Sequence, residues 1–153
     1  LTVENNIRAI LEMTDTSAEY QKEKLEQLIR EFKLEKVRHN LGNNLSGGER
    51  RRTEIARCLA INPKFIMLDE PFAAVDPIAV EDIQSVVYHL KERNIGVLIT
   101  DHKADSMLGI TDRAYMLFEG KVLFQGSSEE LVSNPIVREK YLGQDFVFTR
   151  KKF

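Results

Sequence analysis

The feature of the sequence that most constrains its fold is a pair of short, uninterrupted apolar runs separated by a helical pattern. Residues 65–68 and residues 97–100 each have the length and composition of a strand that is buried on both faces. Between them, Asp76 and Pro77 are a typical N-cap and first helical residue. The order strand, helix, strand predicts a parallel βαβ unit and therefore an α/β fold.

The chain before these strands is expected to be helical. One helix is predicted behind a Thr2 cap, and a second behind a capping box formed by Thr16 and Glu19. The second helix has an apolar stripe at i, i+3, i+4 and i+7 spacing. The apolar positions of the two helices are Val3, Ile7, Ile10 and Leu11, then Leu25, Leu28, Ile29 and Phe32.

A third helix opens at Ser46, which is followed by Gly47 and Gly48 and, three residues on, by Glu49. Two glycines at a helix N-terminus let backbone N–H groups approach an anion closely, and the helix dipole favours negative charge there. An ordinary capping box formed by Ser46 and Glu49 explains the same residues. Three consecutive arginines at 50–52 are disfavoured by the dipole in a first turn, which indicates a phosphate or an acidic partner nearby. At least one of them is expected to face solvent.

Acidic residues and a histidine follow the two predicted strands. Asp69 and Glu70 come directly after the first strand, and His102 follows the second. Ligands of parallel α/β sheets bind at the carboxyl ends of strands, where these residues should meet. One carboxylate can hold Mg²⁺ and its neighbour can orient a water molecule, although an acidic turn without function explains a single strand equally well.

The remaining chain shows local signals only. Residues 119–121 predict a hairpin turn between strands at 114–118 and 122–124. Ser127 with Glu130 predicts another capping box, and Asn134 with Pro135 predicts a last short helix. Residues 149–153 are expected to be a frayed basic tail.

Composition excludes several classes of protein. The chain has 153 residues and a net charge of -2, which is unlike the basic balance of a nucleic-acid binder. Its single cysteine, Cys58, excludes an internal disulfide framework, fits a reducing cytoplasm and is expected to be buried. No apolar run approaches the roughly 20 residues of a membrane-spanning helix, and no signal peptide opens the chain. The start at Leu1 suggests an excised fragment or a processed chain.

Taken in order, four segments resemble the motifs of the ABC ATPase family. Residues 45–49 are similar to its signature motif, with Glu49 where many members carry Gln. Residues 65–71 resemble the Walker B strand with its catalytic glutamate, residues 73–76 resemble the D-loop, and residues 101–102 match the switch-histidine motif. Agreement of four motifs in the right order makes chance similarity negligible.

The resemblance implies a role for each matching residue. Asp69 would help to hold Mg²⁺, Glu70 would polarise the water that attacks the γ-phosphate of ATP, and His102 would contact that phosphate. The signature residues would bind ATP held by the opposite subunit, and Asp76 would communicate across a head-to-tail dimer. The signature set is Ser46, Gly47, Gly48 and Glu49.

The family's P-loop has no counterpart in this sequence. A Gly-x-x-x-x-Gly-Lys-Ser/Thr segment is absent, as are the adenine-stacking aromatic residue and the glutamine loop that precede the helical subdomain in the family. P-loop backbone and lysine hold the β- and γ-phosphates. We therefore expect this chain by itself to bind ATP weakly and to hydrolyse it negligibly.

The implied fold is a P-loop NTPase nucleotide-binding domain without its P-loop strand. We expect a helical subdomain with the signature helix at 1–62, a RecA-like sheet with Walker B and switch histidine at 63–126, and C-terminal helices and tail at 127–153. The P-loop strand would lie between the strands at 97–100 and 114–118. We expect these edges to close on each other, to pair with another chain, or to be disordered.

Within the family, the nearest resemblance is to ATP-binding subunits of lipopolysaccharide exporters. It is carried by residues 46–52, 72–78 and 141–146. It implies a Gram-negative source, a peripheral position on the cytoplasmic face of the inner membrane, and membrane-spanning partner subunits. Branched-chain amino-acid importer ATPases are the next nearest by pattern.

Two other classes of function stay open. A soluble ABC ATPase acting on DNA or the ribosome would normally bring a coiled-coil insertion or a second cassette, and the sequence shows neither. The second class is a non-enzymatic interaction module, which would dock on a partner and contribute only its signature face. Such a module would bind a membrane subunit without dependence on ATP.

Overall fold

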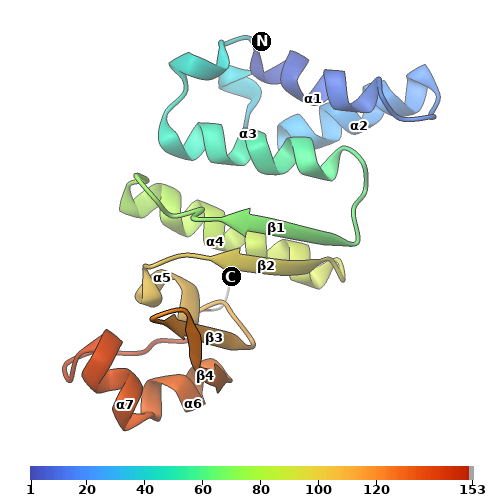
Figure 1. Cartoon of the computed structure of the whole chain (residues 1–153). Coiled ribbons are helices and arrows are strands. Elements are labelled where there is room, and N and C mark those ends of the chain that lie inside the picture. The colour runs from blue at the N-terminus through green and yellow to red at the C-terminus, as the bar shows by residue number, and fades with distance from the viewer. Residues whose placement is uncertain (152–153) are drawn as a thin grey trace. The chain divides into compact units, whose positions relative to one another are not determined.

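The protein is described by a computed structural model that covers residues 1–151 and divides into two compact units (Figure 1). The first unit is Leu1–Thr100 and the second begins at Asp101. The elements of the first unit are the helices α1 (Val3–Leu11), α2 (Ala18–Glu31), η1 (Glu35–Val37), η2 (Gly42–Asn44), α3 (Gly47–Leu59) and α4 (Pro77–Glu92), and the strands β1 (Phe65–Asp69) and β2 (Gly96–Thr100).

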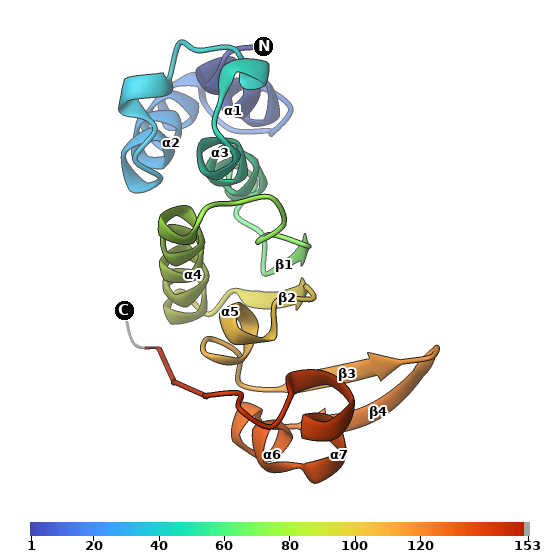
Figure 2. The same cartoon turned by 90° about the vertical axis from the view of Figure 1, so that its left-hand side faces the viewer.

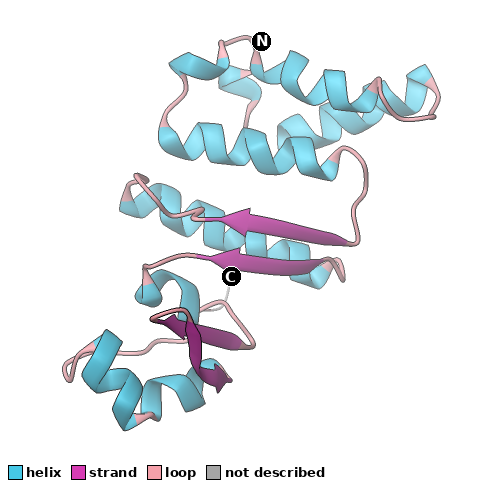
Figure 3. Cartoon of the chain, viewed as in Figure 1, coloured by secondary structure: helices cyan, strands magenta, loops and turns pink. Residues whose placement is uncertain are grey.

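The elements of the second unit are shorter (Figure 3). They are the helices α5 (Ala104–Leu108), α6 (Ser128–Ser133), α7 (Pro135–Val137) and η3 (Arg138–Leu142), and the strands β3 (Ala114–Phe118) and β4 (Lys121–Gly126). Within residues 1–151, no helix has both the length and the apolar character needed to cross a membrane.

Local capping signals place most helix starts as the sequence predicts. The Thr2 hydroxyl accepts from the Asn5 N–H at 3.2 Å and begins α1. The Thr16 cap is wrong, because α2 begins one residue later behind Ser17, whose hydroxyl accepts from the Tyr20 N–H. Thr16 instead shares a hydrogen bond of 2.7 Å with the hydroxyl of Thr14.

The first three α-helices bury the stripe that the sequence marks. Of the eight apolar positions named for α1 and α2 in the sequence analysis, all are buried except Ile10, which is half-buried. Cys58 is exposed, contrary to expectation. It lies on α3 next to Arg57, outside the face on which Ile55, Ala56 and Leu59 are buried.

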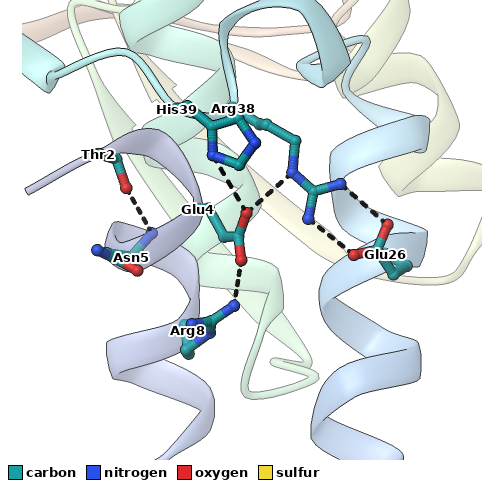
Figure 4. Close-up of polar contacts among 7 residues, drawn as sticks. All are labelled: Thr2, Glu4, Asn5, Arg8, Glu26, Arg38 and His39. Carbon is teal, nitrogen blue, oxygen red and sulfur yellow. Dashed lines mark hydrogen bonds and ion pairs between the residues drawn. The ribbon is translucent and has the colours of Figure 1, made fainter.

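A polar network ties α1 and α2 to the segment that follows them (Figure 4). The Arg38 guanidinium donates two bonds to the Glu26 carboxylate, at 2.8 and 3.2 Å, and a third to Glu4 at 2.9 Å. Glu4 also pairs with Arg8 on its own helix. The hydrogen bonds from Arg38 lower the pKa of Glu26, and those two carboxylates, Glu26 first, raise the pKa of Arg38.

The βαβ unit forms as predicted, with β1 and β2 paired in parallel and α4 lying along one face (Figure 2). The prediction that each strand is buried on both faces is wrong. In β1 only Ile66 and Leu68 are buried, whereas Phe65 is 56% and Met67 71% exposed. The alternation arises because α4 covers one face of the pair and the described residues leave the other face of β1 exposed.

The second unit is a hairpin packed against short helices. Strands β3 and β4 pair antiparallel through the two-residue turn Glu119–Gly120, where both φ angles are positive, as in a type I′ turn. The capping box of Ser127 with Glu130 and the Asn134 cap are confirmed. The buried core of this unit consists of Leu108, Ala114, Met116, Leu131, Val132 and Val137.

The expectation of a frayed tail is wrong for the part that is described. The Lys151 N–H donates to the Gly109 carbonyl at 2.9 Å, and Arg150 pairs with Asp112. Residues 152–153 lie outside the described part of the chain.

That the strand edges at 97–100 and 114–118 close on each other stays a prediction, because the two strands belong to different units. In the part of the chain that is described, β2 pairs only with β1 and β3 only with β4. Disorder is wrong, because both segments form regular strands. Pairing with another chain stays a prediction.

We predict that Arg38→Met lowers the free energy of unfolding by about 1–3 kcal/mol, because it leaves two carboxylates without their shared cation. Glu26, with its lowered folded-state pKa, contributes stability that is complete above the ordinary carboxyl pKa of 4.5 and is lost as pH falls through the lowered value. That acid-dependent loss should shrink in the variant. Urea unfolding between neutral and acidic pH measures both effects. The exposed Lys36→Met is the matched control, and an equal loss in that variant would contradict the assignment.

Candidate functional site

The parallel register brings polar groups together where β1 and β2 end. Asp69 is the partner of Thr100, whose hydroxyl donates to the Asp69 carboxylate. The next residue, Glu70, donates its N–H to the Thr100 carbonyl at 2.8 Å. The expectation that the two strands end side by side is therefore confirmed. That His102 meets Asp69 and Glu70 stays a prediction, because His102 belongs to the second unit.

Glu70 has an unfavourable backbone conformation. Its φ is +44°, in the left-handed region that residues with a Cβ seldom adopt. Its carbonyl accepts from the Ala73 N–H at 3.1 Å, while its carboxylate is exposed and has no hydrogen bond or ion pair within residues 1–151. Such strain is typical of functional sites, where surrounding contacts hold it.

The signature segment forms the capped start of α3. The Ser46 hydroxyl accepts from the Glu49 N–H at 3.3 Å, and the Glu49 carboxylate accepts from the Ser46 N–H at 2.8 Å, so the predicted capping box is confirmed. The Ser46 hydroxyl also donates to Glu49. The backbone and hydroxyl bonds from Ser46 lower the pKa of Glu49. Glu49 therefore carries a full negative charge at neutral pH.

Packing requires a glycine at position 48 and leaves little room for a side chain at position 47. A Cβ at Gly48 would lie 2.6 Å from the Cβ of Ala79 on α4, and one at Gly47 would lie 3.1 Å from the Ala74 carbonyl. These contacts seat the start of α3 on the segment that includes Asp76. The Asp76 carboxylate caps α4 by accepting from the Ala79 N–H at 3.0 Å. The structure thus gives Asp76 a capping role, and its predicted site role stays a prediction.

Carboxylates of the chain itself offset two of the three arginines. Arg51 pairs with Glu54 at 2.8 Å and Arg52 with Asp82 at 3.0 Å. The negative charge that the sequence indicates near the helix start is thus supplied in part by the protein. Arg50 is exposed, as expected for at least one of the three.

His102 belongs to the second unit. Its side chain is 67% exposed, and its Nδ1 lies 3.7 Å from the buried carboxylate of Asp101. The Tyr141 hydroxyl donates to the His102 carbonyl at 2.8 Å. Burial, and then the charge of Asp101, raise the pKa of Tyr141. His102 and Tyr141 border an open depression of about 340 Å³ that Phe146 also lines.

Thr100 and Tyr141 are contacts of site residues that the sequence analysis does not identify. Thr100 could have been found, because pairing two equal runs in register puts it opposite Asp69. Tyr141 is separated from His102 by 39 positions in the sequence, and no local sequence pattern predicts a contact over that separation.

Comparisons with known proteins agree with these motifs. The family model described as ABC transporter matches residues 1–73. A probable ABC transporter ATP-binding protein of Azorhizobium caulinodans is 53% identical over 95% of this chain and 52% of its own length. The lipopolysaccharide export system ATP-binding protein LptB of Acidithiobacillus ferridurans is 51% identical over 95% of the chain and 61% of its own length.

A solved ATP-binding cassette of an ABC transporter, MJ1267, superposes with a TM-score of 0.80 at 31% identity, covering 94% of this chain and 63% of that one. The chain belongs to the ABC ATP-binding proteins. The expected fold, that of an ABC nucleotide-binding domain, is confirmed by this likeness. The chain spans 52% of the length of the first curated relative and 61% of the length of the second.

We predict that Gly48→Ala lowers the free energy of unfolding by about 1–3 kcal/mol, because its methyl group overlaps that of Ala79. Adding Ala79→Gly removes the overlap and should recover part of the loss, less about 1 kcal/mol for a glycine in a helix. Gly42→Ala is the control, since its nearest neighbouring atom would be 3.8 Å away. Additive losses in the double variant, measured by denaturant unfolding, would show that the two residues do not touch.

Proposed function

We propose that this chain carries the Walker B, signature, D-loop and switch segments of an ABC transporter ATPase. In this proposal Glu70 polarises the attacking water and His102 contacts the γ-phosphate. Ser46, Gly47, Gly48 and Glu49 form the face that meets ATP held by a second subunit, and Asp76 communicates with that subunit. The observation that carries the proposal is the placement of Asp69 and a strained Glu70 at the end of β1, beside the end of the parallel strand β2.

The donor set at the strand ends fits a magnesium ion. Asp69 is exposed and offers carboxylate oxygens beside the hydroxyl of Thr100, and oxygen ligands are those that Mg²⁺ prefers. Within residues 1–151 no three His, Cys, Asp or Glu side chains gather as a complete metal site, so nucleotide oxygens and water would complete the shell. When bound, the ion would neutralise charge on the phosphates.

Glu70 differs from its neighbour Asp69 in a way that suits a base. The Asp69 carboxylate already accepts a hydrogen bond from Thr100, whereas that of Glu70 has no such contact. A carboxylate with free acceptor positions can accept a proton from water, which a bonded one does less readily. The two adjacent acids thus suit different roles.

We predict that Glu70→Gln lowers kcat for ATP hydrolysis by about a hundredfold to ten-thousandfold and leaves ATP affinity within a few-fold, as expected for loss of a general base. The assay uses a longer chain in which this sequence follows a P-loop segment. Glu23→Gln on the exposed face of α2 is the charge-matched control. Full turnover by the Glu70→Gln protein would remove Glu70 from the reaction.

We further propose that the transported substrate is lipopolysaccharide. The proposal is supported by the LptB relatives and by the matching residues 46–52, 72–78 and 141–146. The protein would then act as a head-to-tail pair of ATPase subunits bound to membrane-spanning subunits on the cytoplasmic face of the inner membrane. Nucleic acid is not among its proposed partners. A branched-chain amino-acid importer ATPase is the alternative.

We predict that the longer chain restores growth and surface lipopolysaccharide in Escherichia coli depleted of LptB. Lipopolysaccharide reaching the outer membrane measures the outcome directly. The Glu70→Gln form should fail to restore it at equal expression. Failure of the wild-type chain, together with retained ATP hydrolysis in vitro, would reject the substrate and leave the ATPase proposal standing.

A further inference from the structure

The three arginines after the signature glycines have three different environments. The Arg50 side chain is exposed and, within residues 1–151, makes no hydrogen bond or ion pair. Arg52 is largely buried and pairs with Asp82 of α4. Arg51 reaches out of α3 and donates from Nη2 to the carbonyl oxygen of Glu70 at 3.3 Å. One member of the run therefore contacts the strained residue at the end of β1.

This contact acts on a conformation that is unfavourable by itself. The positive φ of Glu70 costs energy that neighbouring bonds have to offset. The N–H of Glu70 is held by the Thr100 carbonyl, and its own carbonyl is held by the Ala73 N–H. Arg51 adds a second donor on that carbonyl, and it is the only one of these donors and acceptors that comes from α3.

Arg51 is oriented before it meets Glu70. Its Nη1 donates to the Glu54 carboxylate one turn along the same helix at 2.8 Å, and its side chain is only 25% exposed. A guanidinium is planar, so fixing one nitrogen directs the other. Little further rotamer freedom is lost when Nη2 bonds the Glu70 carbonyl.

We propose that Arg51 is a positioning residue for Glu70. It contacts the carbonyl and not the carboxylate, so it acts through the backbone that sets where the carboxylate points. The contact also couples the signature helix to the end of β1, two segments of one chain that the proposed function assigns to two different ATP sites of the dimer. The catalytic part of this inference rests on the proposed function, whereas the conformational part does not.

The conformational part is tested in the 153-residue chain by NMR. A residue with positive φ has a short distance between its own amide and Hα protons and gives a strong intraresidue cross-peak. Wild-type Glu70 should show it, Arg51→Ala should weaken or lose it, and Arg50→Ala should keep it. Arg51→Lys keeps the charge with a single donor group and should be intermediate. Retention of the full cross-peak in Arg51→Ala overturns the proposal.

The catalytic part is tested by steady-state ATP hydrolysis in the longer chain with a P-loop. Loss of one charge-assisted hydrogen bond should lower kcat about threefold to thirtyfold in Arg51→Ala. KM should stay unchanged, because the ATP contacts themselves are intact. Arg50→Ala should match wild type, and Arg51→Lys should recover part of kcat. A rise in KM with normal kcat, or equal effects in both alanine variants, overturns the positioning role.

The two arms separate this inference from the proposed function. If the wild-type longer chain does not hydrolyse ATP, the proposed function fails, and the NMR cross-peak still decides whether Arg51 holds Glu70. If wild type is active and Glu70→Gln is not, the proposed function stands, and an unchanged kcat in Arg51→Ala rejects the positioning role alone.

Discussion

The arrangement of the site depends first on the register between β1 and β2. Five consecutive residue pairs run from Phe65 with Gly96 to Asp69 with Thr100, so both strands end at the same level. Gly96 permits this register at its start, since a Cβ there would lie 2.6 Å from the Phe65 ring. A slip of one residue would exchange the faces of the strand and move Asp69 away from the Thr100 hydroxyl. The register therefore fixes where Asp69 and Glu70 lie.

A second constraint is the close packing of the start of α3 against the segment that follows β1 and the first turn of α4. Gly48 approaches Ala79 more closely than a side chain would allow. Two arginines of the same helix add to this contact: Arg52 forms an ion pair with Asp82 on α4, and Arg51 donates a hydrogen bond to the Glu70 carbonyl. Gly48, Arg51 and Arg52, which the sequence places near an expected phosphate or acidic partner, thus hold the signature helix in place. This does not remove a ligand role, because the Ser46 end of the helix stays exposed.

Features that depend on a few neighbouring residues could be predicted from the sequence. The capping boxes at Ser46 and Ser127 and the hairpin at 119–121 are confirmed, because cap and turn geometry is local. Burial was predicted less well. Met67 and Cys58 are apolar in character but exposed, since exposure depends on which elements cover a face, and no periodicity reports that. The left-handed backbone of Glu70 is equally hidden, because it results from hydrogen bonds to Ala73, Thr100 and Arg51.

The capping box limits how the signature segment can meet a phosphate. A helix start leaves its first N–H groups without intrahelical partners. Here the N–H of Ser46 is taken by the Glu49 carboxylate and the N–H of Glu49 by the Ser46 hydroxyl. The N–H groups of Gly47 and Gly48 are those left at the positive end of the dipole. Glu49 is ionised at neutral pH and repels a phosphate, which Gln, the residue of many family members, would not. In the proposed function, phosphate binding at this end would therefore rely on the two glycine N–H groups, of which Gly47 is exposed and Gly48 is buried against α4.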